Sequence, residues 1–484
     1  MPGRVLTGPN VRYKDAKTAR TSAGSWNMNE VELSTRSRLP SWTYLLLVPQ
    51  NLRVAWDSQQ QLTSTLDALQ SKLRRVGVDV DNYTPGLRYE FNPANVEAEI
   101  DAAIHRFVSN PTRPAPKLLL VIIPYIDSSI YNRVKFACDV KEGLLNVCTL
   151  GQKLAKANDQ YFANVALKFN LKLGGRNQYL DNVKLGIIAE GKTMVVGIDV
   201  THPSPGSASN APSVAGIVAS IDQWLGQWPA DLQLQQARQE MVSGLDGLLK
   251  SRLRLWAKNN KGHLPENILI YRDGVSEGQY EIVLDQELPL LRKACKEAYP
   301  ATDSQKGLPR MSIIIVGKRH HTRFYPTREQ DADRSSNPQN GTVVDRGVTE
   351  ARNWDFYLQA HTALQGTARP AHYFTVLDEI FRDRKVQLPF QSAADALEDL
   401  THNLCYLFGR ATKAVSICPP AYYADLVCER ARCYLSRLFD GSPGATPGGS
   451  VSEGGGVGGA DAGQDPDASH VRIHENVRDS MFYI

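Results

Sequence analysis

The chain has 484 residues, of which 42% are hydrophobic and 22% are charged, and its formal net charge is +4. These values are ordinary for a soluble globular protein with about two to four domains, and they exclude a strongly basic or strongly acidic chain. Any surface that binds a polyanion must therefore come from local clustering of Lys and Arg.

The cysteines and the apolar runs indicate the cellular compartment of the protein. Seven cysteines are scattered without a CxxC pair, which predicts reduced, mostly core cysteines in an intracellular, cytoplasmic protein and not a disulfide framework or zinc site. No apolar run approaches the roughly 18–20 residues of a membrane helix, and MPGRVLTGPN lacks the apolar core of a secretory signal. We expect no membrane partner. The abrupt start suggests a piece of a longer protein.

The first part of the chain alternates predicted strands and helices. Residues 1–40 are polar and irregular, and we expect a linker or leader that packs onto a neighbouring unit. TYLLLVP (43–49) and KLLLVIIP (117–124) are short apolar runs typical of buried parallel strands. Helices are predicted over 57–76, around Lys135 and near 152–167. This order predicts a small doubly wound α/β domain over residues 41–182.

A second α/β unit is predicted over residues 183–484. Its expected strands are 193–203, 214–221, 267–274, 311–318 and 371–377, and its expected helices are 231–258, 279–298, 392–408 and 421–438. Residues 441–465 are Gly-rich and predict a flexible insertion.

Two of the apolar strands in this unit end in an acid, at Asp199 and Asp273. A buried carboxylate is costly unless it is paired, and a single such Asp is commonly an N-cap or a salt-bridge partner. Two in one domain favour a shared metal site, because Mg²⁺ prefers oxygen ligands and keeps several waters.

The stretch YRDGVSEGQY (271–280) contains a second acid, which local chemistry separates from the first. Gly274 permits an unusual backbone turn beside Asp273. Ser276 and Gln279 fit an S-x-x-Q capping box, and Glu277 falls in the first helical turn, where negative charge suits the helix dipole. We therefore predict that Glu277 is structural and that Asp273 does the chemistry.

Five segments resemble, in order, successive motifs of eukaryotic Argonaute PIWI domains: GIDVTHPSPG, YRDGVSEGQY, VGKRHHTRFYP, ARNWDFYLQAH and SICPPAYYADL. Upstream, YNRVKFACD and ALKFNLKLGG resemble the Argonaute MID domain. The resemblance covers the chain except the Gly-rich insertion. It implies a Rossmann-like MID domain (41–182) followed by an RNase H-like PIWI domain (183–484), without the N and PAZ domains, and it points most closely to a fungal quelling-type Argonaute.

The resemblance implies an endoribonuclease that uses two divalent metals, Mg²⁺ or Mn²⁺, and leaves a 3′-OH and a 5′-phosphate. Asp199, Asp273 and Asp425 match the metal ligands, and Glu240 matches the family's mobile catalytic glutamate. Many relatives have His at the position of Asp425; an Asp remains a good ligand for a hard cation, so we expect activity. Without the resemblance, Glu240 would be interpreted as an exposed helical residue.

The MID resemblance implies a pocket for the 5′ phosphate of a small guide RNA. Its expected residues are Tyr131, Lys135, Lys168, Lys172 and Arg430, in which lysines converge on a dianion and Tyr131 stacks on the first base. The family's glutamine is replaced by Val147 and Cys148, and we expect Thr149 or Asn146 to substitute. The loop that reads the first base matches Tyr125, Ile126, Asp127, Ser128 and Ser129. The Ile484 carboxylate is expected near this pocket.

The KRHHTR run (318–323) lacks the Cys/His spacing of a zinc site, and a basic strand end facing the guide backbone fits better. The expected guide-backbone contacts are Lys318, Arg319, Arg323, His361, Arg410, Ser416 and Tyr422. His402 lies on an apolar helix and is predicted to be structural.

Two functions fit this pattern. The first is a monomeric, guide-directed nuclease lobe that binds a 5′-phosphorylated small RNA, a complementary target RNA and silencing-complex proteins. The alternative is a catalytically silent guide-binding module that recruits silencing partners; the four acids favour the first. An unguided nucleotide-binding enzyme is disfavoured, because no Gly-rich phosphate loop follows TYLLLVPQN.

Overall fold

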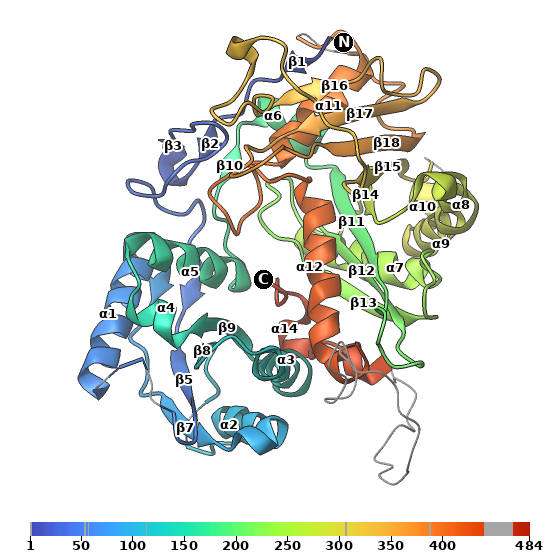
Figure 1. The fold of residues 1–484 in the computed structure, drawn as a ribbon. Helices are drawn as coiled ribbons and strands as arrows, with labels where there is room; N and C mark the ends of the chain where they lie inside the picture. The colour runs from blue at the N-terminus through green and yellow to red at the C-terminus, as the bar shows by residue number, and fades with distance from the viewer. Residues whose placement is uncertain are drawn as a thin grey trace, which may run out of the picture.

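The computed structural model describes residues 2–52, 55–56, 58–112, 114–304, 307–386, 389–439 and 468–484. The predicted flexible insertion, 441–465, lies outside the described residues. The chain folds into two α/β units, each built on its own large sheet (Figure 1). The α/β fold class predicted from the sequence is therefore confirmed.

The first unit is a parallel four-stranded sheet in the order β7 (Leu87–Phe91), β5 (Trp42–Pro49), β8 (Leu118–Ile123) and β9 (Leu145–Leu150). Alternate side chains of β5 enter two cores. Leu46 packs with α1 (Gln59–Arg75) and α5 (Asp159–Lys172), and Leu45 packs with α2 (Val96–Val108) and α3 (Ser128–Phe136). Helices on both faces explain why β5 is buried at every position and why β8 is apolar at every position.

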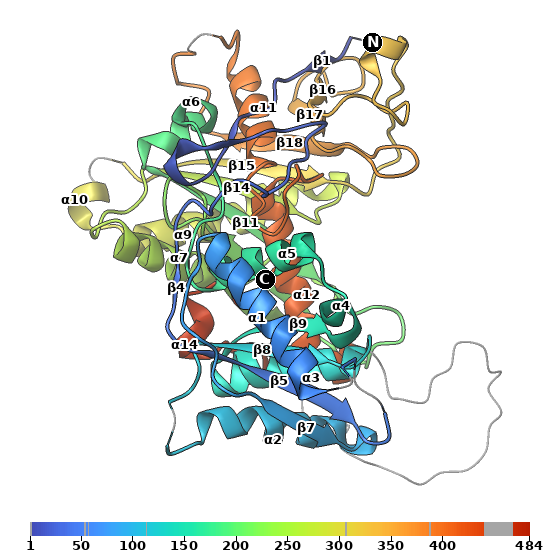
Figure 2. The same ribbon diagram turned by 90° about the vertical axis from the view of Figure 1, so that its left-hand side faces the viewer.

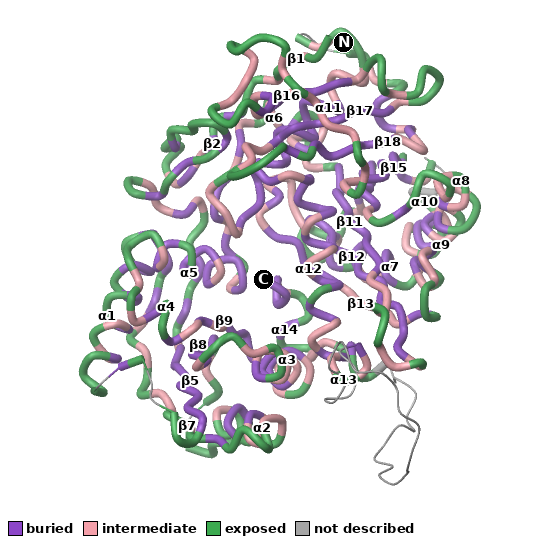
Figure 3. Tube along the Cα trace, in the orientation of Figure 1, coloured by how far each residue is buried: buried purple, intermediate pink, exposed green. Residues whose placement is uncertain are grey.

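The second unit is a nine-stranded sheet whose three central strands are parallel: β15 (Arg310–Gly317), β14 (Asn267–Asp273) and β11 (Thr193–Thr201). On one side follow β12 (Ser213–Ala219) and β13 (Ala230–Gln235). On the other follow β18 (Ala371–Asp378), β17 (Trp354–Gln359), β16 (Thr342–Val344) and β1 (Arg4–Val5). The central strands are buried (Figure 3).

Helices cover both faces of this sheet. The helix α12 (Pro419–Tyr434) contacts β11, β12 and β14 on one face and also contacts α3 of the first unit. On the other face, α7 (Leu245–Asn259) and α9 (Leu288–Ala298) share a core with β11 and β14. The helix α11 (Ala393–Leu404) lies near β17. As a result, α12 stands between the two sheets (Figure 1).

Two predicted helices are wrong in their bounds. The stretch 231–258 begins as the strand β13, and its helix starts at Leu245. In DLQLQ the leucines alternate with polar residues, which is a strand period that the helix-favouring glutamines obscured. The stretch near 152–167 is two helices, α4 (Gly151–Ala155) and α5, because the Asn158 side chain caps α5 by accepting from the Tyr161 backbone.

The expected capping box at Ser276 does not form. The Ser276 hydroxyl donates to the Gln279 side chain at 2.8 Å and accepts no backbone N–H, and a short 3-10 turn, Glu277–Gln279, follows. Glu277 itself is exposed in the first turn of that segment. Helical structure then continues through α8 (Tyr280–Ile282) and a π-helical segment, Val283–Glu287, into α9.

The N-terminal segment touches both units, as expected of a leader that packs on its neighbours. The strand β1 pairs with β16, while β2 (Val11–Arg12) pairs with β3 (Thr18–Ala19) and β10 (Tyr179–Leu180). Further on, β4 (Arg38–Leu39) pairs with β6 (Asp79–Val80). Figure 2 shows this dark blue segment running from β1 down to β4.

The seven cysteines are free, and five of them are buried, which confirms the prediction of mostly core thiols. Among the described helices, none is both long and apolar enough to cross a bilayer.

Candidate functional site

The structure brings three predicted acids to one end of the central sheet. The parallel register places Ile198 opposite Arg272, so that Asp199 and Asp273, which follow them, are neighbours across β11 and β14. Asp425 comes from α12, whose Cys428 thiol lies 3.4 Å from the Asp199 carbonyl oxygen. The Asp273 and Asp425 carboxylates are close enough to Asp199 to raise its pKa.

Glu240 reaches the same cluster from the loop between β13 and α7, so its interpretation as an exposed helical residue is wrong. Its carboxylate lies 2.9 Å from Arg272 Nη1 and 2.8 Å from His202 Nε2. The Glu240 and Asp199 carboxylates both lie close to Gly274. A Cβ added to Gly274 would lie 3.4 Å from a Glu240 carboxylate oxygen and 3.1 Å from an Asp199 carboxylate oxygen. Gly274 also has a φ of +88°, which glycine tolerates best.

Burial raises the pKa values of the three aspartates, and repulsion from a neighbouring carboxylate adds to the effect for each. The pKa of Asp199 is well above its usual value because of burial and the nearby Asp273 and Asp425. Burial is also the main reason that the pKa values of Asp273 and Asp425 rise to about 6. Such a cluster gains from a cation that neutralises it.

Two observations fit these residues to a hard divalent cation. The donors are carboxylate oxygens, which Mg²⁺ and Mn²⁺ accept. Within the described part of the chain, no side-chain or backbone group donates a hydrogen bond to the Asp425 carboxylate, and the buried Glu240 Oε1 has no aligned hydrogen-bond donor despite its ion pair with Arg272. Asp199, Asp273 and Asp425 do not all present oxygens within 4.8 Å of one another, so a bound ion would have to draw them closer.

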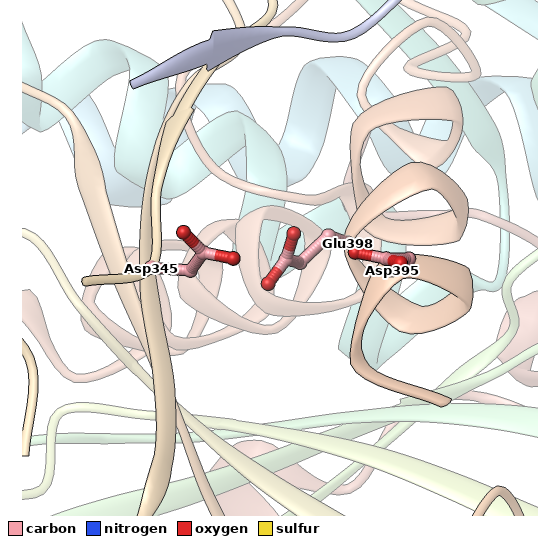
Figure 4. A group of neighbouring side chains, drawn as sticks. All are labelled: Asp345, Asp395 and Glu398. Atoms are coloured by element: carbon pink, nitrogen blue, oxygen red, sulfur yellow. The ribbon is translucent and has the colours of Figure 1, made fainter. Parts of the chain in front are cut away.

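A different trio does meet that spacing in the described residues: Asp345, Asp395 and Glu398 (Figure 4). This cluster already holds a cation, because the Arg4 guanidinium of β1 forms ion pairs with all three carboxylates. It therefore anchors the N-terminal segment to α11 and is not the predicted metal site.

Directly after Asp425, α12 also borders a cavity of about 200 Å³ between the two units. Four cationic side chains line it: Lys135 from α3, Lys168 from α5, Arg430 from α12 and Arg410. Tyr131 lines it one helical turn before Lys135, and Ile484 lines it as expected for the chain terminus. Burial, together with Arg410 and Lys135, lowers the pKa of Lys168 to about 8. The crowding of cations marks a site for an anion.

Lys172 lies behind this cavity and not on its lining. Its ammonium is buried and donates to the Phe482 carbonyl. Burial, then Lys135 and Arg430, hold its pKa well below the usual range. The side chain holds the C-terminal tail, and its expected contact with a guide phosphate stays a prediction.

The Thr149 hydroxyl is engaged by the Tyr161 hydroxyl at 2.6 Å, and Thr149 does not line the cavity, so its expected role stays a prediction. Asn146 stands closer to the expectation: its side-chain oxygen accepts from Lys135 Nζ at 2.5 Å. Its amide donates to Asp139 at 2.8 Å, so it connects Lys135 to the network below.

The expected first-base loop leads into α3. Asp127 caps the helix by accepting from the Ile130 backbone at 3.0 Å, and Ser129 donates to the same carboxylate. Ser128 is already the first residue of the helix, while Tyr125 and Ile126 are 36% and 84% exposed. The two exposed side chains are therefore available to a ligand.

The expected guide-backbone residues do not form one group. Lys318 donates to Ser416 and lies near His361, whose pKa burial lowers to about 4. Arg323 folds back onto the carbonyls of His320 and Thr322. Tyr422 of α12 stacks on Phe408, Arg319 is exposed, and Arg410 lines the cavity described above.

Three remaining expectations concern histidines. His320 hydrogen-bonds the Pro370 carbonyl at 3.0 Å, and His321 is exposed, so the pair does not converge on one point. His402 is fully buried on α11, and burial lowers its pKa to about 4, which agrees with a structural role.

Sequence reasoning missed the residues that hold the Glu240 and Arg430 side chains in place. Arg272 is fully buried and joins Glu240 to Glu287 at 2.9 Å each. Asp139 is buried and pairs with Arg430 at 2.7 Å. An Arg inside the apolar run NILIYRDG was a usable signal, because a buried guanidinium requires carboxylate partners.

Comparison with known proteins identifies the family. The Piwi domain model matches residues 118–436, which extends across the predicted domain boundary at residue 183. The chain belongs to the Argonaute family. Rice argonaute MEL1 is 36% identical over the whole chain and 45% of its own length, and argonaute 5 of Arabidopsis thaliana is 34% identical over 99% and 46%. The chain thus spans about half the length of these curated relatives.

Solved Argonaute lobes share its fold. The C-terminal lobe of a budding yeast Argonaute superposes with a TM-score of 0.81 at 27% identity, covering 100% of this chain and 95% of the other. The MID–PIWI domains of Neurospora crassa QDE-2 match with a TM-score of 0.65 at 33% identity, over 94% and 100%. This Argonaute lobe therefore combines a MID unit with an RNase H-like PIWI unit. Plant and fungal relatives match at similar identity, so the quelling-type assignment stays a prediction.

Proposed function

We propose that this Argonaute lobe binds a small guide RNA by its 5′ phosphate and cleaves complementary target RNA. The observation that carries the proposal is the position of α12. This helix supplies Arg430 to the cationic cavity and Asp425 to the acid cluster, so one rigid element fixes the separation of the two sites. A further similar structure, Kluyveromyces polysporus Argonaute with a guide RNA, has a TM-score of 0.80 at 27% identity and supports an RNA ligand.

The cavity suits a phosphate monoester in charge and size. Four cations converge on the cavity: Lys135, Lys168, Arg410 and Arg430. Fewer carboxylates oppose them, because Asp139 pairs with Arg430 from behind the cavity and Glu429 is the acidic side chain in the lining. A dianion placed among them forms charge-assisted hydrogen bonds. Tyr131 lies beside Lys135, with its ring 5.2 Å from the ammonium, where a base can stack.

At the acid cluster, Asp199, Asp273 and Asp425 would hold divalent metal. When bound, such metal supplies Lewis-acid activation of water and stabilises the leaving oxygen of the scissile phosphate. Glu240 is held beside these acids by Arg272 and His202, where it can accept a proton or orient water. Arg319 is exposed and close enough to lower the pKa values of Asp273 and Asp425, so it can attract the target backbone to this edge.

The cleavage proposal is tested by Asp273→Ala in the complete protein. Removing a metal ligand should reduce target cleavage by at least about a thousandfold, because the electrostatic stabilisation of the reacting phosphate is lost. Glu277→Gln is the matched control, since that acid is exposed and four residues away, and it should cleave normally. Cleavage assays with a guide and a labelled target measure the effect.

A second readout does not depend on activity. Mn²⁺ should raise the melting temperature of the unchanged protein and of Glu277→Gln, but less that of Asp273→Ala. Cleavage that persists in Asp273→Ala would contradict the proposed metal role. Normal guide binding with no cleavage in any variant would instead support the silent guide-binding module.

Guide anchoring is tested by Lys168→Ala. The variant should lose about tenfold or more of the preference for a 5′-phosphorylated over a 5′-hydroxyl guide, because one charge-assisted contact is worth about 1.5–3 kcal/mol. Lys153→Ala removes an exposed charge from α4 of the same unit and should leave the preference unchanged. Filter binding of the two guides gives both affinities. An unaltered ratio in Lys168→Ala would argue against the cavity as the anchor.

A further inference from the structure

A second cationic cavity lies at the edge of the large sheet, away from both sites. It has a volume of about 610 Å³, and its walls are the edge strand β13, the helix α7 and the C-terminal segment 469–478. It shares no lining residue with the cavity between the two units. The volume is in the range of small-molecule sites, about 300–1,000 Å³.

Three arginines face this cavity from two elements: Arg252 of α7, and Arg472 and Arg478 of the C-terminal segment. Arg252 is 3% exposed, and its Nη1 atom has no hydrogen-bond partner. A buried guanidinium nitrogen without a partner is uncommon, because the loss of its hydration is costly. This unpaired donor on the cavity wall indicates a missing acceptor.

The carboxylates described nearby neutralise the arginines only in part. Asp231 of β13 is 3.7 Å from Arg252 Nη2, but it accepts shorter hydrogen bonds, 2.6 Å from the Ser251 hydroxyl and 3.0 Å from the Leu232 backbone. Asp479 pairs with Lys258 at 3.2 Å and lies 3.9 Å from Arg478. Among the described residues, no ion pair or hydrogen bond reaches the Arg472 guanidinium. Counting the described residues alone, the cavity therefore carries surplus positive charge.

We propose that this cavity binds a small anion that carries two or more linked phosphates. Guanidinium groups present paired donors that match phosphate oxygens, and three of them on two walls suit an anion with several charges. The source of the anion is either free inorganic polyphosphate or the phosphate chain of a nucleotide. The C-terminal segment supplies two of the arginines, and the tail that follows it lines the cavity between the two units. Anion binding would therefore restrict the motion of that tail.

The test is calorimetric titration of the chain with tripolyphosphate, comparing the unchanged protein with the double variant Arg472→Gln and Arg478→Gln. Both side chains are exposed, so the fold should be retained. The double variant should bind one tripolyphosphate fewer per chain, or bind it at least tenfold more weakly. Arg254→Gln is the matched control, because it removes an exposed charge from α7 outside the cavity.

The variant Lys168→Ala distinguishes this site from the cavity between the two units. It should still bind tripolyphosphate at the site that depends on Arg472 and Arg478. The proposal is overturned if the double variant and Arg254→Gln bind tripolyphosphate as the unchanged protein does, or if Lys168→Ala abolishes all binding. A nucleoside triphosphate titrated in parallel distinguishes the sources. Affinity equal to that of tripolyphosphate indicates recognition of the phosphate chain, and tenfold tighter binding indicates a nucleotide.

Discussion

At the scale of single residues, the charge state of Lys168 links the cationic cavity between the two units, where we propose that the guide binds, to pH. Its pKa of about 8 lies below the usual lysine value of 10.5, and burial is the first cause. The folded, ligand-free protein therefore releases this proton more readily than the unfolded chain does. The resulting cost to stability is present below pH 8 and disappears as the pH rises from about 8 to 10.5.

Guide affinity should change with pH in the opposite direction. Between pH 7 and 9 Lys168 loses its charge in the free protein, whereas a guide phosphate, with a second pKa of about 6, stays dianionic. We expect affinity for a 5′-phosphorylated guide to fall about tenfold over this range at constant ionic strength. Binding curves for Lys168→Met supply the control, because without the titrating group the decline should flatten. An equally steep decline in that variant would assign the effect to another residue.

At the scale of elements, α12 packs close to the large sheet because two strands each have a glycine at the point of contact. A Cβ on Gly197 of β11 would lie 1.9 Å from the Pro420 carbonyl oxygen, and one on Gly216 of β12 would lie 3.0 Å from the Cys428 sulfur. The close approach lets Asp425 stand beside Asp199. A bulkier residue at either position would push the helix away from the sheet.

Gly197→Ala should accordingly destabilise the protein by about 3 kcal/mol, at the upper end for overpacking of a core. It should also weaken both guide binding and cleavage, because α12 carries residues of each site. Gly247→Ala in α7 has no atom within 4 Å of its new Cβ and should be neutral or slightly stabilising. Thermal melting of the two variants provides the comparison. Wild-type stability in Gly197→Ala would contradict the packing argument.

At the scale of the whole molecule, the chain terminus locks the two units together. Arg430 donates to the carbonyls of Phe482 and Tyr483 at 2.9 and 3.0 Å, and Lys172 of the MID unit donates to the first of these. The Tyr483 hydroxyl donates to the Trp228 carbonyl at 2.7 Å. The last residues thus accept from cations of both units, and they are buried (Figure 3).

Deleting residues 482–484 should leave Lys172 and Arg430 buried with fewer acceptors. Loss of a partner from a buried charge costs about 3–5 kcal/mol, so the melting temperature and the affinity for a 5′-phosphorylated guide should both fall. Ile484→Val keeps the chain length and the terminal carboxylate and should change neither. Melting curves and filter binding measure the two effects. A deleted chain that melts and binds guide as before would refute the proposed lock.

Local sequence patterns were enough to predict several strands of both sheets. Uninterrupted apolar runs marked β5, β8, β14 and β15, because strands covered on both faces must be apolar throughout. The motif order was sufficient to indicate the Argonaute family. Bounds failed where local signals conflict: glutamines hid the strand β13, and a single Asn cap divided the helix expected near 152–167.

Which side chains share a site became known from the packed fold. In the fold, Glu240 lies against Arg272 and His202. Arg410 lines the cationic cavity between the two units, whereas Lys172 and Thr149 do not line it. The fold also assigned the tightest carboxylate trio to Arg4 and not to a metal. These choices depend on contacts between residues far apart in the chain. Spacing along a sequence cannot specify them, because burial and charge pairing arise only when the sheets and α12 have packed.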